Sequence, residues 1–223
     1  MCGRYTLSLP IADIIEDLDL DKPEFEIEPR YNIAPTQRMP ILTGELPRRL
    51  SLSRWGLIPS WAKDISIGNK LLNARAETLA DKPAFRQAFQ QQRCLIPADG
   101  FYEWKKSPYG KTAQHIHLRN RGLLTFGGLW ESWTDAEGRE MRSYTIITTQ
   151  PNSLMVDIHD RMPVIIEKSD RDAWLSQDAG PDDLEALMLP FREGALEAVA
   201  VGDRVNSTRN EGPDLLLPPM SLF

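Results

Sequence analysis

The sequence contains little cysteine and no long apolar run. Its 223 residues include two cysteines, Cys2 and Cys94, which excludes a disulfide framework and favours a reducing cytoplasm. Every apolar run is far shorter than the roughly 20 residues of a membrane helix, so we expect no membrane partner. The N-terminus has no charged region followed by an apolar stretch, and we therefore expect no signal peptide.

Positive charge is also in short supply. The formal net charge of −6 argues against broad electrostatic binding of nucleic acid. Arginines nevertheless outnumber lysines 18 to 8, and the arginine guanidinium binds phosphate better than an ammonium does. The composition is therefore compatible with a local basic groove on an acidic protein. Two of the three histidines, His115 and His117, alternate on one strand face without a third ligand nearby. We expect that face to be exposed, and we expect no metal and no cofactor.

Internal repeats, low-complexity tracts and Gly/Ser-rich linkers are missing too, which favours one domain over residues 1–223, with an irregular tail from about 212. The acidic, Pro-containing residues 19–30 predict a loop. Helical spacing predicts helices over 10–18 and 84–91, with two more starting at Ser169 as N-cap and at Pro181. The predicted strands are 4–7, 39–42, 50–55, 71–75, 94–96, 100–105, 114–119, 123–129, 143–149, 164–166 and 196–201. This pattern predicts an α+β fold on a largely antiparallel, barrel-like twisted sheet with peripheral helices.

The first four residues offer unusual chemistry. Once Met1 is removed, Cys2 carries an α-amine and a thiol on adjacent carbons, with reference pKa values of about 8 and about 8.5. The amine condenses with an aldehyde to an imine, and proximity helps the thiol to close on that imine as a thiazolidine. Gly3 allows close approach to the backbone, and Arg4 adds a permanent cation. Cys94, by contrast, lies in an apolar run typical of a buried thiol.

Further stretches carry side chains suited to chemistry or binding. His159 in "IHDRMPVII" is a candidate proton shuttle, and Glu103 in "ADGFYEWKK" is a carboxyl whose aromatic neighbours favour a raised pKa. Asn73 and Arg75 share one face of a predicted strand, where the arginine supplies a fork for phosphate or carboxylate. Trp61, which ends "WGLIPSW", is a candidate for stacking on a base. Each residue taken singly is also typical of a capping group, a core side chain or an ordinary strand face.

Taken together, these pieces occur in a familiar order. Cys2-Gly3-Arg4 opens the chain, and "RYNIAPTQ" at 30–37, "WGLIPSW" at 55–61, "NARAET" at 73–78, "PADGFYEWK" at 97–105 and "DIHDRMP" at 157–163 follow. This arrangement resembles the abasic-site processing proteins, also called the SOS-response-associated peptidase family. Each motif is modest, but six in this order after a cysteine at position 2 form a specific pattern that runs from residue 2 to about 212.

The resemblance implies a covalent function on damaged DNA. The family cross-links to abasic sites in single-stranded DNA through a thiazolidine formed by its terminal cysteine, which shields the lesion during repair and the SOS response. It implies removal of Met1, by the protein itself or by an aminopeptidase. Residue matching implies that Cys2 is the nucleophile and that Asn73 positions the reacting group. It implies that Glu103 moves protons during imine formation and reversal, and that His159 helps to open the deoxyribose ring and shuttles protons. The implied DNA contacts are Arg4, Asn32, Trp61, Arg75, Thr148 and Arg161.

Two positions depart from the family pattern, and two alternatives stay open. Ala62 follows Trp61 where relatives often carry a second Trp, and Pro83 stands where some relatives carry Arg; both bear on DNA affinity rather than on cross-linking. The opening Met-Cys-Gly is also typical of glutamine amidotransferases with an N-terminal nucleophile, but the chain lacks the Asn-Gly pair of such a site. A non-catalytic module that binds single-stranded DNA is the other alternative. We expect a monomer in the cytoplasm, associated with DNA, and leave open whether lyase cleavage or reversal of the cross-link dominates.

Overall fold

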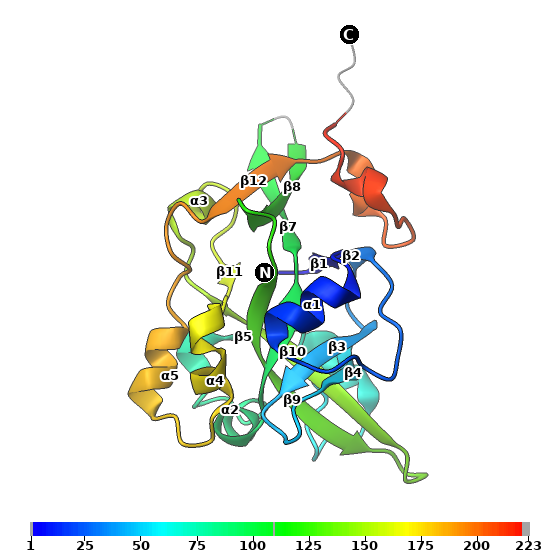
Figure 1. Cartoon of the computed structure of the whole chain (residues 1–223), viewed down its shortest axis with the longest axis vertical. Coiled ribbons are helices and arrows are strands. Elements are labelled where there is room, and N and C mark those ends of the chain that lie inside the picture. The colour runs from blue at the N-terminus through cyan, green and yellow to red at the C-terminus, as the bar shows by residue number, and fades with distance from the viewer. Residues whose placement is uncertain (1, 109, 220–223) are drawn as a thin grey trace.

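The computed structural model describes residues 2–108 and 110–219, whose strands form two sheets (Figure 1). One sheet has the order β12-β8-β7-β1-β2 and the other the order β11-β10-β4-β3-β6-β9, with β5 paired to β10. The strands of the first sheet are β1 (Arg4–Leu7), β2 (Arg30–Ile33), β7 (Gly100–Ser107), β8 (Gly110–Leu118) and β12 (Leu196–Ala200). Those of the second are β3 (Arg38–Thr43), β4 (Leu50–Trp55), β5 (Asn73–Arg75), β6 (Arg93–Ala98), β9 (Leu124–Thr134), β10 (Glu140–Thr149) and β11 (Met162–Pro163).

The second sheet closes on itself. Strand β10 pairs with β4 on one side and with β9 on the other, so that β4, β3, β6, β9 and β10 make a five-stranded ring. Among the described strand pairs, those of β10 with β4 and β5 are parallel and the rest are antiparallel. Closure removes the exposed edges that would otherwise invite pairing with another chain.

An aromatic cluster joins the two sheets at the centre of the core. Tyr5 of β1 packs edge-on against Trp55 of β4, with ring centroids 5.3 Å apart, and against Phe126 of β9 at 5.9 Å. Its hydroxyl shares a 2.7 Å hydrogen bond with the hydroxyl of Tyr144 on β10, so the buried phenols satisfy each other. Strand β1 is thereby fixed against the barrel, which sets the position of the residues that precede it.

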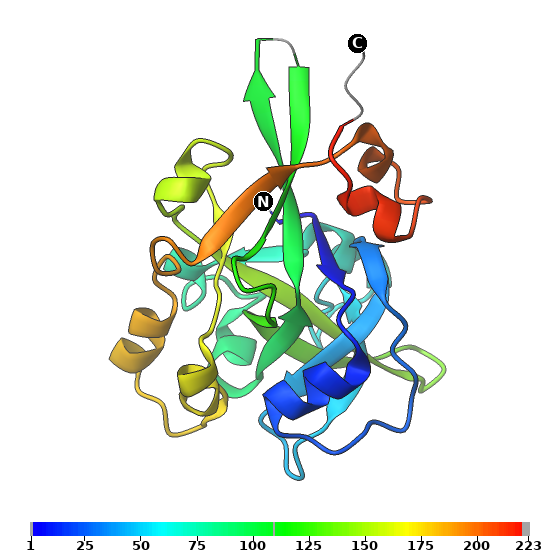
Figure 2. The same ribbon diagram turned by 45° about the horizontal axis from the view of Figure 1, so that its top comes forward.

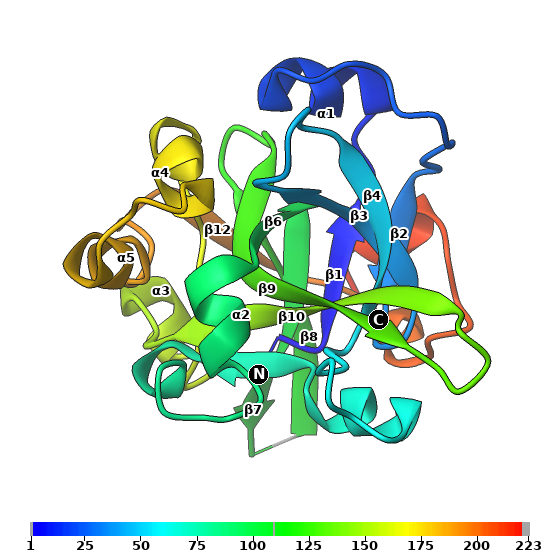
Figure 3. The same cartoon turned by 90° about the horizontal axis from the view of Figure 1, so that it is seen from below.

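The helices lie at the periphery, as Figure 3 shows for α1, α4 and α5. Helix α1 follows Pro10 and buries Ile14 and Leu18, which are four residues apart and therefore on one face. It ends where Asp19 adopts a left-handed conformation with φ 53°. The helices are α1 (Ile11–Leu18), α2 (Arg86–Gln91), α3 (Ser153–Val156), α4 (Arg171–Leu175) and α5 (Pro181–Leu187).

The α+β fold class with a largely antiparallel, barrel-like sheet is confirmed, and several element boundaries are wrong. Residues 30–33 form strand β2, next to the predicted loop at 19–30, and helix α2 begins at Arg86 rather than at 84. The predicted strand at 164–166 is replaced by β11 and a single bridge at Ile165. Helix α4 has Asp170 as its N-cap instead of Ser169. The tail expected to be irregular contains a 3₁₀ turn at Pro213–Leu216, and its last four residues lie outside the described part.

The prediction of an exposed face at His115 and His117 is wrong, because both side chains are buried. Strand β12 pairs along β8 beside these residues, with Val199 opposite His115, and Nε2 of His115 lies 3.1 Å from Oγ1 of Thr6 on β1. Gly100 leaves the room that the ring needs, since a Cβ there would lie 2.2 Å from His115 Nε2. Burial lowers the pKa of His115 to about 3, with His117 adding to the effect, so His115 stays neutral at physiological pH.

No helix in the described ranges is long and apolar enough to cross a membrane.

Candidate functional site

Cys2 lies immediately before β1, with its side chain buried in the core. Its main-chain carbonyl accepts a 3.0 Å hydrogen bond from Nδ2 of Asn73. Asn73 opens strand β5 and pairs with Ile146 of β10, so the barrel wall fixes the amide that holds Cys2. Asn73 Oδ1 is buried and has no hydrogen-bond partner among the described residues, which leaves one acceptor available at this point.

Glu103 approaches Cys2 through strand pairing. In the antiparallel ladder of β1 and β7, Arg4 lies opposite Tyr102, which brings Glu103 beside the residues that precede β1. The carboxyl is 4% exposed, and burial raises its pKa from 4.5 to about 7. Burial also raises the pKa of the Cys2 thiol well above its ordinary value, and the charge of Glu103 adds to that shift. Glu103 therefore exchanges a proton near neutral pH, whereas the thiol needs a base.

His159 lies between α3 and β11 at the edge of a cavity. Its Nδ1 accepts a 3.1 Å hydrogen bond from the main-chain N–H of Arg161 and lies 2.9 Å from Oδ1 of Asp160. Burial lowers the pKa of His159, although Asp160 opposes the shift, and the ring is therefore mainly neutral at pH 7. The cavity has a volume of about 710 Å³ and is lined by Trp104, Lys106, Gln150, Pro151, Val156, Asp157, Ile158, His159 and Asp160.

The four predicted catalytic side chains thus come from four separated segments. Asn73 contacts Cys2 directly, and Glu103 acts on the Cys2 thiol through its charge. The charge of Asp160 acts to raise the pKa of both Glu103 and His159, although burial dominates the shift of each group. Their catalytic roles stay predictions. The predicted removal of Met1 concerns a residue outside the described part of the chain.

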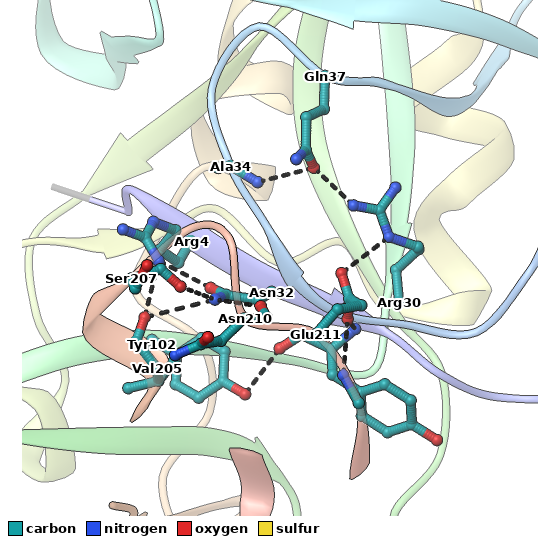
Figure 4. Close-up of polar contacts among 12 residues, drawn as sticks. Arg4, Arg30, Asn32, Ala34, Gln37, Tyr102, Val205, Ser207, Asn210 and Glu211 are labelled. Carbon is teal, nitrogen blue, oxygen red and sulfur yellow. Dashed lines mark hydrogen bonds and ion pairs between the residues drawn. The ribbon is translucent and has the colours of Figure 1, made fainter. Parts of the chain in front are cut away.

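Two of the predicted DNA contacts, Arg4 and Asn32, are tied to the C-terminal segment (Figure 4). Nη1 of Arg4 donates to Oδ1 of Asn32 at 2.7 Å and to the carbonyl oxygen of Val205 at 2.9 Å. Asn32 is buried, and its Nδ2 donates at 3.0 Å to each of the carbonyl oxygens of Ser207 and Asn210. Sequence reasoning missed this segment, because nothing in residues 203–210 marks them as neighbours of β1. Both side chains therefore hold strands β1 and β2 against the segment at 205–210. Their contact with DNA stays a prediction.

A second group of predicted DNA contacts gathers where β5, β10 and β11 meet. Arg75 is exposed at the end of β5, whereas Arg161 is 8% exposed and forms a bidentate pair with Glu77, at 2.6 and 2.9 Å. Thr148 is buried, and its hydroxyl donates to the carbonyl oxygen of Ala74 at 3.3 Å. Glu77 lies within the "NARAET" motif at 73–78, but nothing in the sequence indicates that it occupies the fork of Arg161.

Trp61 stands on the surface in the loop after β4. It is 58% exposed, while Trp55 at the start of the same motif is buried in the core. The hollow beside Trp61 has a volume of about 410 Å³ and is lined by Trp61, Ala62, Lys63, Asp64, Ser66, Ile67 and Lys70. Ala62 contributes its carbonyl oxygen to Nε1 of Trp133 at 2.7 Å. An exposed indole with two lysines beside it is suited to a base and its phosphates, and base stacking at Trp61 stays a prediction.

Comparison with protein families decides the family. The model of a family described as SOS response associated peptidase matches residues 1–208. The chain belongs to this family. Its relatives include the abasic site processing protein YoqW of Bacillus subtilis, which is 47% identical over 97% of this chain and 99% of its own length. The abasic site processing protein HMCES of Xenopus tropicalis is 30% identical over 97% of this chain and 78% of its own length.

Solved structures share the fold. A crystal structure of a protein from Bacteroides thetaiotaomicron covers 98% of this chain with a TM-score of 0.90 at 24% identity, and its whole length is matched. A second, from Bordetella bronchiseptica, covers 90% of this chain and 99% of its own with a TM-score of 0.79 at 26% identity. The barrel, the first sheet and the peripheral helices are therefore an architecture that this chain shares with these solved structures.

Proposed function

We propose that this protein captures abasic sites in single-stranded DNA covalently, through a thiazolidine at Cys2 formed after Met1 has been removed. One observation carries the proposal above the others. The main chain at Cys2 is held by Asn73 beside Glu103, a carboxyl whose buried position raises its pKa to about 7. The names of the relatives, abasic site processing proteins, support the same substrate.

The reaction balances with the loss of one water. The ring-opened sugar of an abasic site presents an aldehyde, and the α-amine of Cys2 adds to its carbon to give a carbinolamine. The carbinolamine hydroxyl leaves as water once it has received a proton, and an imine remains. The Cys2 sulfur then adds to the imine carbon, its proton passes to the nitrogen, and the five-membered ring closes. The thiol and the amine belong to one residue, so ring closure costs little entropy.

Glu103 and His159 divide the proton transfers between them in this scheme. With its pKa raised to about 7 by burial, Glu103 delivers the proton that the departing hydroxyl needs, and as a carboxylate it then takes the thiol proton. The lowered pKa of His159 keeps its ring neutral at pH 7, which suits the transfer of a proton from the sugar hydroxyl to the ring oxygen as the deoxyribose opens.

The DNA strand is assigned to the exposed cations and the exposed indole. Arg75 is exposed near Asn73, and Trp61 presents more than half of its surface to solvent for stacking on a base. Arg161 donates to phosphate only where its fork is released from Glu77. In this assignment the DNA contacts are limited to a small part of the surface. Only that part needs positive charge, which agrees with a net charge of −6 on the whole chain.

The test is adduct formation on a denaturing gel. Protein whose mass shows that Met1 is absent is incubated with a single-stranded oligonucleotide that carries one abasic site, and with a matched oligonucleotide that carries none. We expect a heat-stable shifted species with the abasic oligonucleotide alone. Cys2→Ala abolishes it, whereas Cys94→Ala retains it, because Cys94 is a buried thiol on β6.

The same preparation separates the alternatives. Protein without Met1 that gives no adduct contradicts the proposal, and so does an adduct that persists in the Cys2→Ala variant. Hydrolysis of glutamine in place of adduct formation would indicate an amidotransferase-like site instead. Reversible DNA binding with no covalent species would indicate a non-catalytic module that binds single-stranded DNA.

A further inference from the structure

A basic hairpin projects from the sheet next to the candidate site (Figure 2). Strands β7 and β8 extend past the rest of the fold, and the strand that carries Glu103 continues directly into the projection. Three of the eight lysines of the chain lie on it, Lys105, Lys106 and Lys111, and all three are exposed. In the part of the chain that the structure describes, none of the three makes an ion pair.

The arrangement of these lysines opposes local stability. Lys106 lies directly opposite Lys111 in the antiparallel ladder, so the two ammonium groups share one face of the hairpin. Like charges that face each other across two strands are destabilising, and other residues at these positions would remove the repulsion. A local conflict of this kind, which no ion pair among the described residues offsets, is typical of a functional surface.

The face that carries the lysine pair is continuous with the cavity at His159. Trp104 and Lys106 are two residues apart on β7, so they project to the same side, and both line that cavity. The positive charge of Lys106 is also felt at His159. Val156, which is 62% exposed, adds apolar surface to the same lining. The cavity thus offers an aromatic ring and an apolar side chain for a base, with Lys106 in its lining and Lys111 opposite Lys106 on the hairpin.

We propose that Lys106 and Lys111 bind the backbone phosphates of the DNA strand on one side of the reacting sugar, and that the cavity lined by Trp104 and His159 holds the neighbouring nucleotide. The volume of about 710 Å³ lies in the range of small-ligand sites. Asp157 and Asp160 also line the cavity, and neither pairs with a lysine among the described residues, so the lysine charge is available to an anion. This inference rests on the proposed function for its location beside a reacting sugar.

The test measures the salt dependence of reversible DNA binding. In a Cys2→Ala background, which prevents covalent trapping, the affinity for a single-stranded oligonucleotide is measured over a series of salt concentrations. Each phosphate contact on single-stranded DNA contributes about 0.7 to the slope of log K against log salt, so Lys106→Ala with Lys111→Ala should lower the slope by about 1.4. Lys106→Arg with Lys111→Arg should restore it.

A matched control is Lys22→Ala with Lys82→Ala, which removes the same charge from two exposed lysines outside the hairpin. If the hairpin pair lowers the slope no more than this control pair does, the inference is wrong. Thermal unfolding serves as the check on folding: the hairpin pair should be at least as stable as the parent, because the repulsion between the lysines is gone.

Failure of the inference and failure of the proposed function give different results. With Cys2 intact, Lys106→Ala with Lys111→Ala should still give the adduct, but at a higher DNA concentration for half-maximal yield. An unchanged half-maximal concentration overturns the inference and leaves the cross-linking proposal intact. A lowered salt slope in a protein that forms no adduct would support the hairpin as a DNA contact and contradict the cross-linking chemistry.

Discussion

Nδ2 of Asn73 donates a 3.0 Å hydrogen bond to the carbonyl oxygen of Cys2, and this bond joins the barrel to the residue proposed as the nucleophile. The bond goes to the main chain and leaves the thiol uncommitted to Asn73. It therefore fixes the orientation of the residue whose amine and sulfur must both reach one carbon atom. The buried Oδ1 of the same amide, which lacks a partner in the described ranges, is suited to accept a hydrogen bond from the amine or from a substrate hydroxyl.

Removing this amide should slow the reaction more than it weakens DNA binding. Asn73→Ala deletes one hydrogen bond of about 1–1.5 kcal/mol, so we expect the rate of adduct formation to fall by roughly tenfold or more. Single-turnover kinetics at saturating DNA measure the effect. Asn120→Ala is the control, because Oδ1 of Asn120 accepts its hydrogen bond from the main-chain N–H of Gly122 in a turn of the described chain. An unchanged rate in Asn73→Ala would show that the bond to Cys2 is merely structural.

The pH profile of cross-linking should report Glu103. The acid form of Glu103 disappears as the pH rises through about 7, while the free α-amine of Cys2 appears through about pH 8. The rate should therefore pass through a maximum between these values. Glu103→Gln, which cannot donate or accept the proton, should lower the rate and remove the alkaline decline while reversible DNA binding is kept. Loss of DNA binding in Glu103→Gln would assign this residue a structural role.

The same carboxyl should make stability depend on pH. The folded-state pKa of Glu103 is raised from 4.5 to about 7, so between these pH values the folded protein holds a proton that the unfolded chain has released, and the stabilising contribution is complete below about pH 4.5. That contribution is lost as the pH rises through about 7, and for a shift of this size it amounts to roughly 3 kcal/mol. Urea unfolding of wild type and Glu103→Gln should therefore show a difference that grows in favour of Gln from acid to mildly alkaline pH. A difference independent of pH would mean that burial does not raise this pKa.

Glu77 should compete with DNA for Arg161. The carboxylate holds both ends of the guanidinium fork, and these hydrogen bonds are the main reason why the pKa of Glu77 is lowered. Glu77→Gln weakens the pair and removes a negative charge beside the strand path, so reversible DNA binding should tighten severalfold at a stability cost of about 1 kcal/mol. Fluorescence polarisation in a Cys2→Ala background measures the affinity. Glu45→Gln is the matched control, since Glu45 holds Arg142 in the same bidentate way. Equal effects of both substitutions would remove Arg161 from the binding site.

The fold class was predictable because local sequence patterns indicate most of the strands. Alternating and apolar runs around Tyr5, Trp55 and Tyr144 predict strands, and few helices are long enough to compete with them. The errors at His115 and His117 arise from pairing over long sequence distances. Strand β12 follows β8 by nearly eighty residues and pairs beside the histidines, and no local pattern indicates that partner.

The sequence indicates candidate residues for the site, whereas their contacts depend on the tertiary fold. Cys2 and Glu103 are a hundred residues apart, and only the pairing of β1 with β7 brings them together. The roles of Arg4 and Asn32 depend likewise on where residues 205–210 pack, because carbonyl oxygens from that segment occupy their side chains. Side-chain chemistry can be inferred from residue type, whereas the partner of a polar group is set by the tertiary fold.

The two cysteines of the chain allow one measurement to test the central claim directly. The adduct formed with a single abasic oligonucleotide is denatured, alkylated at its free thiols and weighed by mass spectrometry. We expect the summed masses of the two components less one water, with a single alkylation at Cys94, because a thiazolidine consumes both the amine and the thiol of Cys2. An adduct alkylated at both cysteines would be an open imine, and it would contradict the claim that the sulfur of Cys2 closes the ring.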